Sequence, residues 1–207
     1  MNFLAHLYLS GDDEEIITGN FIADHVKGKA FFGFSEGIRT GILFHRQIDL
    51  FTDTHPSFLE SKKRLAFKYR KYAGVITDMF YDHFLASSWS KYSHEGIDQF
   101  TKRMYAVVMK RYFMLPPKTK RILPFMAKDN WLKGYGTFEG LERALRGMDK
   151  RTPFESLMGE SVEDLRRDYG LYHGEFSMFF PEMILFAEEK RKMLVAGQIS
   201  NNIILPV

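Results

Sequence analysis

Cysteine is absent from the 207 residues of this chain. Its absence excludes disulfide bonds, cysteine-based zinc ribbons and thiol nucleophiles. Any bound metal would therefore depend on His, Asp, Glu or Asn side chains and on water. Uncharged apolar runs of about 18 residues are also missing, so the sequence predicts no membrane-spanning helix.

The first residues, MNFLAHLYLSGDDEE, have no basic region before their short apolar run and turn acidic at once. This pattern differs from a signal peptide, and we expect a cytoplasmic protein. The net charge of +3 is small and no nucleic-acid-binding motif is recognisable, so nucleic acid is not an expected partner. The sequence also has neither a phosphate-binding P-loop nor a Gly-x-Ser-x-Gly nucleophile elbow.

Runs that alternate with period two are nearly missing, whereas apolar residues recur at helical intervals along most of the chain. With 45% hydrophobic residues the chain can bury a sizeable core. We predict an all-α helical bundle in a single domain spanning residues 1–207. The predicted helices lie near residues 35–53, 57–72, 73–92, 96–113, 139–148, 161–169 and 180–196. The stretch from about 116 to 136, with paired prolines and two glycines, is the least regular.

Ionisable side chains interrupt several of these apolar segments. In DMFYDHFLA, Asp78 and Asp82 are four residues apart and share a helix face, and His83 follows directly. His6 lies within FLAHLYL, and Asp24 lies within GNFIADHVKG. Buried charge is unfavourable unless it is paired, hydrogen bonded or bound to a metal. These residues are therefore candidates for a shared functional site.

The segment GIRTGILFHRQIDLFTD repeats the pattern on one helix face. Gly37, Gly41, His45, Asp49 and Asp53 follow one another at spacings of four. Two carboxylates and an imidazole would stack below glycines that permit close helix packing. If the ionisable side chains of these segments converge, they suit a Mn, Fe, Mg or Zn ion. Separate hydrogen-bonded core networks are the alternative that the spacing leaves open.

Four motifs carry a resemblance to a known family: MNFLAHLYLS, GNFIADHVKG, GILFHRQIDLFTDTHP and DMFYDHFLA. In this order they resemble the motifs of the acyl carrier protein phosphodiesterases, which remove 4′-phosphopantetheine from holo acyl carrier protein. That family is regarded as a divergent relative of the helical HD phosphohydrolases. The resemblance implies an HD-domain-like helical bundle, a phosphodiester substrate, and a divalent cofactor, most simply Mn²⁺, with Mg²⁺ or Fe²⁺ as alternatives.

A divalent ion would lower the pKa of a bound water and neutralise charge on the phosphoryl oxygens. We predict direct metal ligation by Asp82 and His83, with His6 and Asp24 as the completing ligands. Asp78 is predicted to be a further ligand or to orient one.

The remaining catalytic roles fall to the His45 segment. His45 is the predicted general acid or base for the departing seryl oxygen, and Asp49 is predicted to orient it. Arg46 is the predicted phosphate contact, through its fixed fork of donors, although an ordinary surface ion pair would also explain it.

The segment PSFLESKKRLAFKYRKY contains six basic residues against one acidic residue, Glu60. We predict that Lys62, Lys63 and Arg64 bind the acidic surface of acyl carrier protein, although a solvated helix face is the alternative. Two other functions remain open at this point. One is an HD-type hydrolase of a nucleotide or other small phosphoester, and the other is a non-catalytic protein that binds acyl carrier protein.

Overall fold

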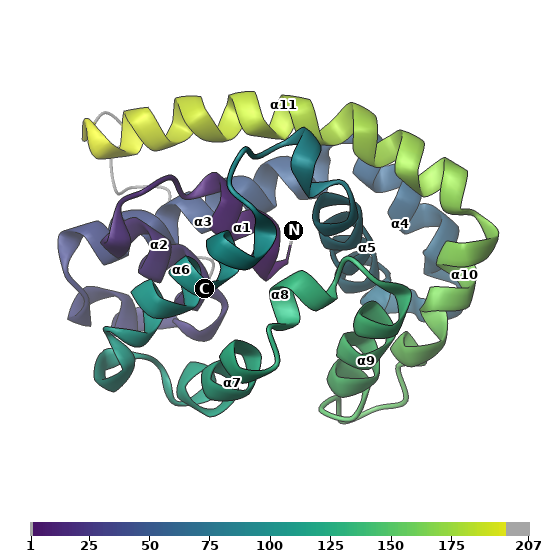
Figure 1. Ribbon diagram of the computed structural model, residues 1–207, viewed down its shortest axis with the longest axis horizontal. Helices are drawn as coiled ribbons and strands as arrows, with labels where there is room; N and C mark the ends of the chain where they lie inside the picture. Colours follow the sequence, from purple (N-terminus) through teal and green to yellow (C-terminus); the bar gives the residue numbers. More distant parts are fainter. Residues whose placement is uncertain (1, 198–207) are drawn as a thin grey trace.

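The computed structural model describes residues 2–197, and within them the chain forms eleven α-helices and no strand (Figure 1). The all-α prediction is confirmed. The helices are α1 Phe3–Leu9, α2 Glu14–Ile22, α3 Glu36–Thr54, α4 Pro56–Tyr69, α5 Ala73–Ser87, α6 Ile97–Met109, α7 Pro117–Lys128, α8 Trp131–Gly134, α9 Phe138–Asp149, α10 Ser161–Arg167 and α11 Tyr169–Val195. None of these helices combines the length and hydropathy needed to cross a bilayer.

Two glycines bring α2 and α3 into backbone contact. A Cβ atom added to Gly41 would lie 2.3 Å from the carbonyl oxygen of Ile16 and 2.9 Å from the Cα of Gly19. Any larger residue at either glycine would force the helices apart. The sequence pattern predicted this close approach at Gly41, and it fixes how the end of α2 faces the middle of α3.

Helix α5 is nearly all buried, and it carries charge into the core. The Asp82 side chain is fully buried, and its two oxygens accept hydrogen bonds from the backbone amides of Leu4 (2.9 Å) and Ala5 (3.2 Å). These amides belong to the first turn of α1, where backbone N–H groups have no partner within their own helix. Asp82 therefore holds the start of α1 against α5.

The longest helix, α11, begins earlier than the sequence predicted. It spans 27 residues, crosses the top of the view in Figure 1 and packs against α3, α4 and α5. The predicted helix near 180–196 is thus only its second half. Pro181 lies inside α11, but it is exposed, as is Ser177 one turn earlier, so the carbonyl that loses its N–H partner faces solvent. The helix therefore continues through this proline.

The segment from 116 to 136 is also more regular than the sequence suggested. Pro117 occupies the first turn of α7, a position at which the missing N–H is not needed. After α7, Asn130 adopts a left-handed conformation with φ of 43°, and the short helix α8 follows. Figure 1 places α7, α8 and α9 together on the side of the molecule opposite α11.

Candidate metal centre

Two histidines and an aspartate from different helices converge between α1 and α3. His6 Nε2 lies 3.2 Å from Asp49 Oδ1, and His45 Nε2 lies 3.1 Å from Asp49 Oδ2. One ligand atom from each of these three side chains falls within 4.8 Å of the others, and no second group of this kind occurs within residues 2–197. Asp24, from the short 3₁₀ turn Ala23–His25, adds an oxygen 3.3 Å from His45 Nε2.

The local sequence explains this arrangement. His45 and Asp49 are one helical turn apart on α3, so their side chains share a face. The glycine contact between α2 and α3 brings the end of α2, and with it Asp24, to the same face. The imidazole rings of His6 and His45 stack, with centroids 3.9 Å apart and planes 15° apart. The two Nε2 atoms therefore point toward the same carboxylate.

Asn20 fixes the tautomer of His45. His45 Nδ1 lies 2.9 Å from the carbonyl oxygen of Asn20 and 3.0 Å from its Oδ1, both of which accept hydrogen bonds. The Asn20 amide nitrogen donates to the carbonyl oxygen of His6 and to Ser10 Oγ, each at 2.9 Å. Because Nδ1 carries the proton, Nε2 of a neutral His45 presents its lone pair to Asp49 and Asp24. Because this lone pair faces two carboxylates, either a second proton on Nε2 or a cation bound between these groups is required.

The electrostatics of the protein alone follow from this geometry. Burial and the neighbouring His45 lower the pKa of His6 to about 4. Burial would lower the pKa of His45 too, but its hydrogen bonds to Asp24 and Asp49 outweigh burial and raise it to about 9. Burial would raise the pKa of Asp49, but hydrogen bonds from both histidines hold it well below its usual range. The centre thus combines two buried imidazoles with two partly exposed carboxylates, and it favours a positive charge.

Asp82 and His83, which the sequence predicted as ligands, have other partners. The Asp82 oxygens accept from α1 amides, as described above, and burial raises the pKa of this carboxyl to about 7. His83 Nδ1 donates to the carbonyl oxygen of Tyr135 at 2.8 Å. Asp78 is half-buried, and burial of its carboxyl raises its pKa to about 6. None of the three joins the group formed by His6, His45 and Asp49.

The predicted phosphate contact and the predicted docking residues lie at different places. Arg46 packs its guanidinium 5.7 Å from the ring of Phe31, and its buried Nη1 has no hydrogen-bond partner among the described residues. Arg64 forms a two-pronged ion pair with Glu175 of α11, at 2.6 and 3.0 Å. Lys63 is 78% exposed and lies 3.9 Å from Glu60, whereas Lys62 is half-buried beside Gly74 of α5.

Comparison with known proteins supports the sequence resemblance. A family model described as acyl carrier protein phosphodiesterase matches residues 1–183. The chain belongs to the acyl carrier protein phosphodiesterase family. Relatives of that name include proteins from Photorhabdus laumondii (31% identity, 92% of this chain and 96% of the relative), Enterobacter sp. strain 638 (30%, 92% and 100%) and Escherichia coli O157:H7 (31%, 92% and 99%). No solved structure matches the chain.

For this member of the acyl carrier protein phosphodiesterase family, sequence reasoning missed two residues near the candidate sites. Asn20 orients His45, and its spacing of four from Asp24 was the only signal for it. Tyr135 receives the hydrogen bond of His83 through its backbone, so its side-chain type gave no signal. Both positions follow from packing between segments far apart in the sequence.

Proposed function

We propose that this protein hydrolyses the phosphodiester that joins 4′-phosphopantetheine to acyl carrier protein, with a divalent ion held by His6, His45, Asp49 and Asp24. Family membership supports the substrate, because the relatives are named for that activity. The convergence of His6, His45 and Asp49 within 4.8 Å is the observation that supports the metal.

The donor set fits a divalent ion. Two imidazole nitrogens and two carboxylates face one another, and the Nδ1 atom of His45 is already committed to Asn20. Imidazole beside carboxylate suits Mn²⁺ or Fe²⁺, whereas Mg²⁺ prefers a shell made of oxygen atoms alone. We therefore favour Mn²⁺, with Fe²⁺ ahead of Mg²⁺ as the alternative.

When bound, the ion would supply a water of lowered pKa and neutralise charge on the phosphoryl oxygens. The residues of the chain arrange the surroundings. Asn20 holds the His45 ring in one orientation, as supporting hydrogen bonds do for metal-binding histidines. The Asp24 side chain is 66% exposed, whereas His6 and His45 are buried. Asp24 is therefore the member of the donor set that substrate and water reach first.

This proposal assigns different roles to several predicted residues. His45 and Asp49 become ligands instead of an acid or base and its orienting group. Asp82 and His83 become positioning residues, because the first anchors the start of α1 and the second anchors Tyr135. Arg46 remains the proposed phosphate contact, since one of its donor nitrogens has no hydrogen-bond partner within residues 2–197.

Acyl carrier protein is the proposed partner, and the lysines at the start of α4 are its proposed docking site. Lys63 is exposed and Lys62 is half-buried, and their charge would attract an acidic protein. Arg64 contributes less, because Glu175 already binds its guanidinium and Tyr172 packs beneath it, 4.7 Å from the guanidinium carbon.

The test is incubation of the full chain with holo acyl carrier protein and Mn²⁺, followed by mass spectrometry of both products. We expect apo acyl carrier protein and free 4′-phosphopantetheine, and no turnover after chelation. Asp49→Asn should reduce both metal affinity and turnover by more than about hundredfold. Asp53→Asn is the matched control, because Asp53 lies one turn further along α3 and is exposed.

Each outcome separates the candidate functions. Wild-type turnover by the Asp49→Asn variant, or by chelated protein, would refute the proposed centre. Hydrolysis of small phosphoesters without any attack on the carrier would favour an HD-type hydrolase with a different substrate. Metal-independent binding of the carrier with no product would identify a non-catalytic binding protein.

A further inference from the structure

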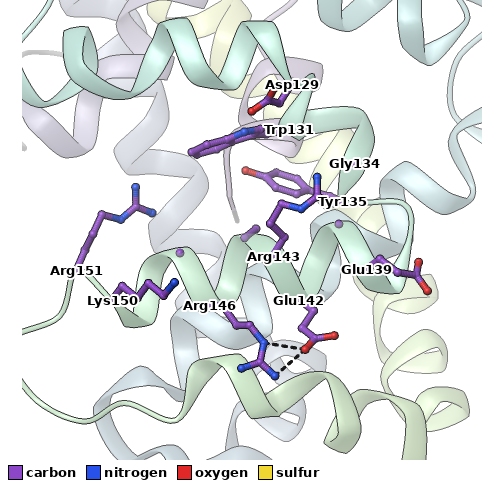
Figure 2. Close-up of a pocket in the computed structure, with 13 residues that line it drawn as sticks. Asp129, Trp131, Gly134, Tyr135, Glu139, Glu142, Arg143, Arg146, Lys150 and Arg151 are labelled. Atoms are coloured by element: carbon purple, nitrogen blue, oxygen red, sulfur yellow. Dashed lines mark hydrogen bonds and ion pairs between the residues drawn. The ribbon is translucent and has the colours of Figure 1, made fainter.

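A second site lies outside the metal centre, in a cavity of about 530 Å³ between α8 and α9 (Figure 2). Its volume falls within the range of small-molecule sites. One face of α9 lines it, with Arg143 and Gly147 spaced by one turn and Lys150 and Arg151 at the end of the helix. No function described above uses this cavity.

Aromatic rings form the opposite wall. The side chains of Trp131 and Tyr135 lie above α9, and Figure 2 shows Arg143 extending toward Tyr135. Gly147 leaves space on the α9 side of the cavity, because a Cβ atom added there would meet no atom within 4 Å. The cavity thus offers flat apolar surfaces and open space for an elongated organic body.

Some of the basic side chains that line the cavity have an acidic partner, and others have none. Arg146 is neutralised by Glu142 at 2.7 Å, and this pair points away from the aromatic wall in Figure 2. In contrast, no ion pair or hydrogen bond engages the side chains of Arg143, Lys150 or Arg151 within residues 2–197. Lys150 and Arg151 lie together at the side of the cavity away from Glu139 (Figure 2).

We propose that this cavity binds an organic phosphate, with the phosphate at Lys150 and Arg151 and the uncharged body against Trp131 and Tyr135. Arg143 extends toward Tyr135 (Figure 2) and would contact the body of the ligand. Guanidinium groups bind phosphate oxygens through paired N–H donors, and a lysine adds a point charge. A phosphomonoester dianion matches two adjacent unpaired cations better than a carboxylate does.

None of the proposed metal ligands His6, Asp24, His45 and Asp49 lines this cavity. The released 4′-phosphopantetheine is a phosphomonoester on an extended, uncharged body, and it is the ligand we favour. This identity rests on the proposed function, whereas the affinity for organic phosphates does not. Nucleotides and coenzyme A carry the same chemistry and are the other source.

Fluorescence offers a direct measurement, because the chain has only two tryptophans and the other one, Trp89, is buried elsewhere. Titration of the full chain in chelating buffer separates this site from the metal centre. We expect 4′-phosphopantetheine to change the emission of Trp131, and Trp131→Phe to abolish that signal. Pantetheine without phosphate should bind at least tenfold more weakly.

Variants connect the signal to the cavity. Lys150→Ala combined with Arg151→Ala should weaken binding at least tenfold, and Gly147→Leu should abolish it by filling the space on the α9 side while α9 stays folded. Lys102→Ala, an exposed lysine on α6, is the charge control. Calorimetry on each variant replaces fluorescence where the signal is small, and circular dichroism verifies folding.

The binding measurements can support or overturn the proposed phosphate site. Equal binding of pantetheine and 4′-phosphopantetheine, unchanged affinity in the double variant, or no binding of any organic phosphate would overturn the proposal. Binding of ADP and coenzyme A but not of 4′-phosphopantetheine would support the site and identify nucleotides as its ligands. Because chelated protein is used, binding without turnover would sustain this site even if the proposed hydrolysis fails.

Discussion

The buried Asp82 carboxylate should make the stability of the protein depend on pH. Its pKa is about 7 in the folded state, because burial disfavours the charged form, against about 3.9 in an unfolded chain. The folded protein therefore holds this proton more tightly than the unfolded chain does. The resulting stabilisation is fully present below pH of about 4 and is lost as the pH rises to about 7.

The magnitude follows from the size of the pKa difference. About three pH units at 1.36 kcal/mol each amount to about 4 kcal/mol between pH 4 and pH 8. Asp82→Asn removes this titration and leaves one α1 amide without an acceptor, at a cost of about 2 kcal/mol. The variant should therefore be less stable than the wild type at pH 4.5 and more stable at pH 8, with equal stability between pH 5 and 6.

Urea unfolding at four or five pH values between 4.5 and 8 measures this difference directly. Asp78, whose pKa burial also raises, titrates in both proteins, so the comparison reports the Asp82 carboxyl together with its repulsion by Asp78. Asp129→Asn, at an exposed position, controls for the loss of one negative charge. Stability curves for wild type and Asp82→Asn that stay parallel across the range would refute this account of the buried carboxylate.

Three further experiments with variants test packing, anchoring and docking. Gly41→Ala should destabilise the protein by about 3 kcal/mol and reduce activity, because the added Cβ would meet the backbone of α2. Gly174→Ala, which adds a Cβ in open space on α11, should stabilise the protein slightly. Thermal unfolding of both variants measures the difference. Arg64→Ala should lower the unfolding free energy by about 2 kcal/mol in urea, and an unchanged value would show the ion pair to be inert. Lys62→Glu with Lys63→Glu should raise the KM for holo carrier protein about tenfold at low salt and leave small-diester hydrolysis unchanged, whereas equal KM values would place docking elsewhere.

Helical periodicity was sufficient to predict most of the fold. The pattern near 35–53 became α3, and the pattern after residue 73 became α5. The prediction was wrong for the last helix, which begins at Tyr169 and not near residue 180. Pro181 is tolerated inside α11 because it faces solvent, whereas Pro116 and Pro117 do separate α6 from α7. Whether a proline interrupts a helix depends on exposure, which a single sequence does not report.

The spacing of ionisable residues in the sequence also identified the side chains that belong to polar sites, but it did not show which of them lie in contact. His6, Asp24, His45 and Asp49 were all singled out, and the structure brings them together. Their association depends on the backbone contact between α2 and α3 and on the placement of α1. Asp82 differs, because its partners are amides 77 and 78 residues away and any residue type could supply them.

The adjacent residues Asp82 and His83 bear on how mutational data for this protein should be interpreted. One holds the helix that carries His6, and the other holds Tyr135 in the wall of the cavity between α8 and α9. If they are the positioning residues proposed above, alanine at either position should lower turnover, although neither side chain would touch the metal. A screen based on activity alone would therefore classify both as catalytic. Only direct measurement of bound metal in each folded variant separates a coordinating group from one that aligns two distant parts of the molecule.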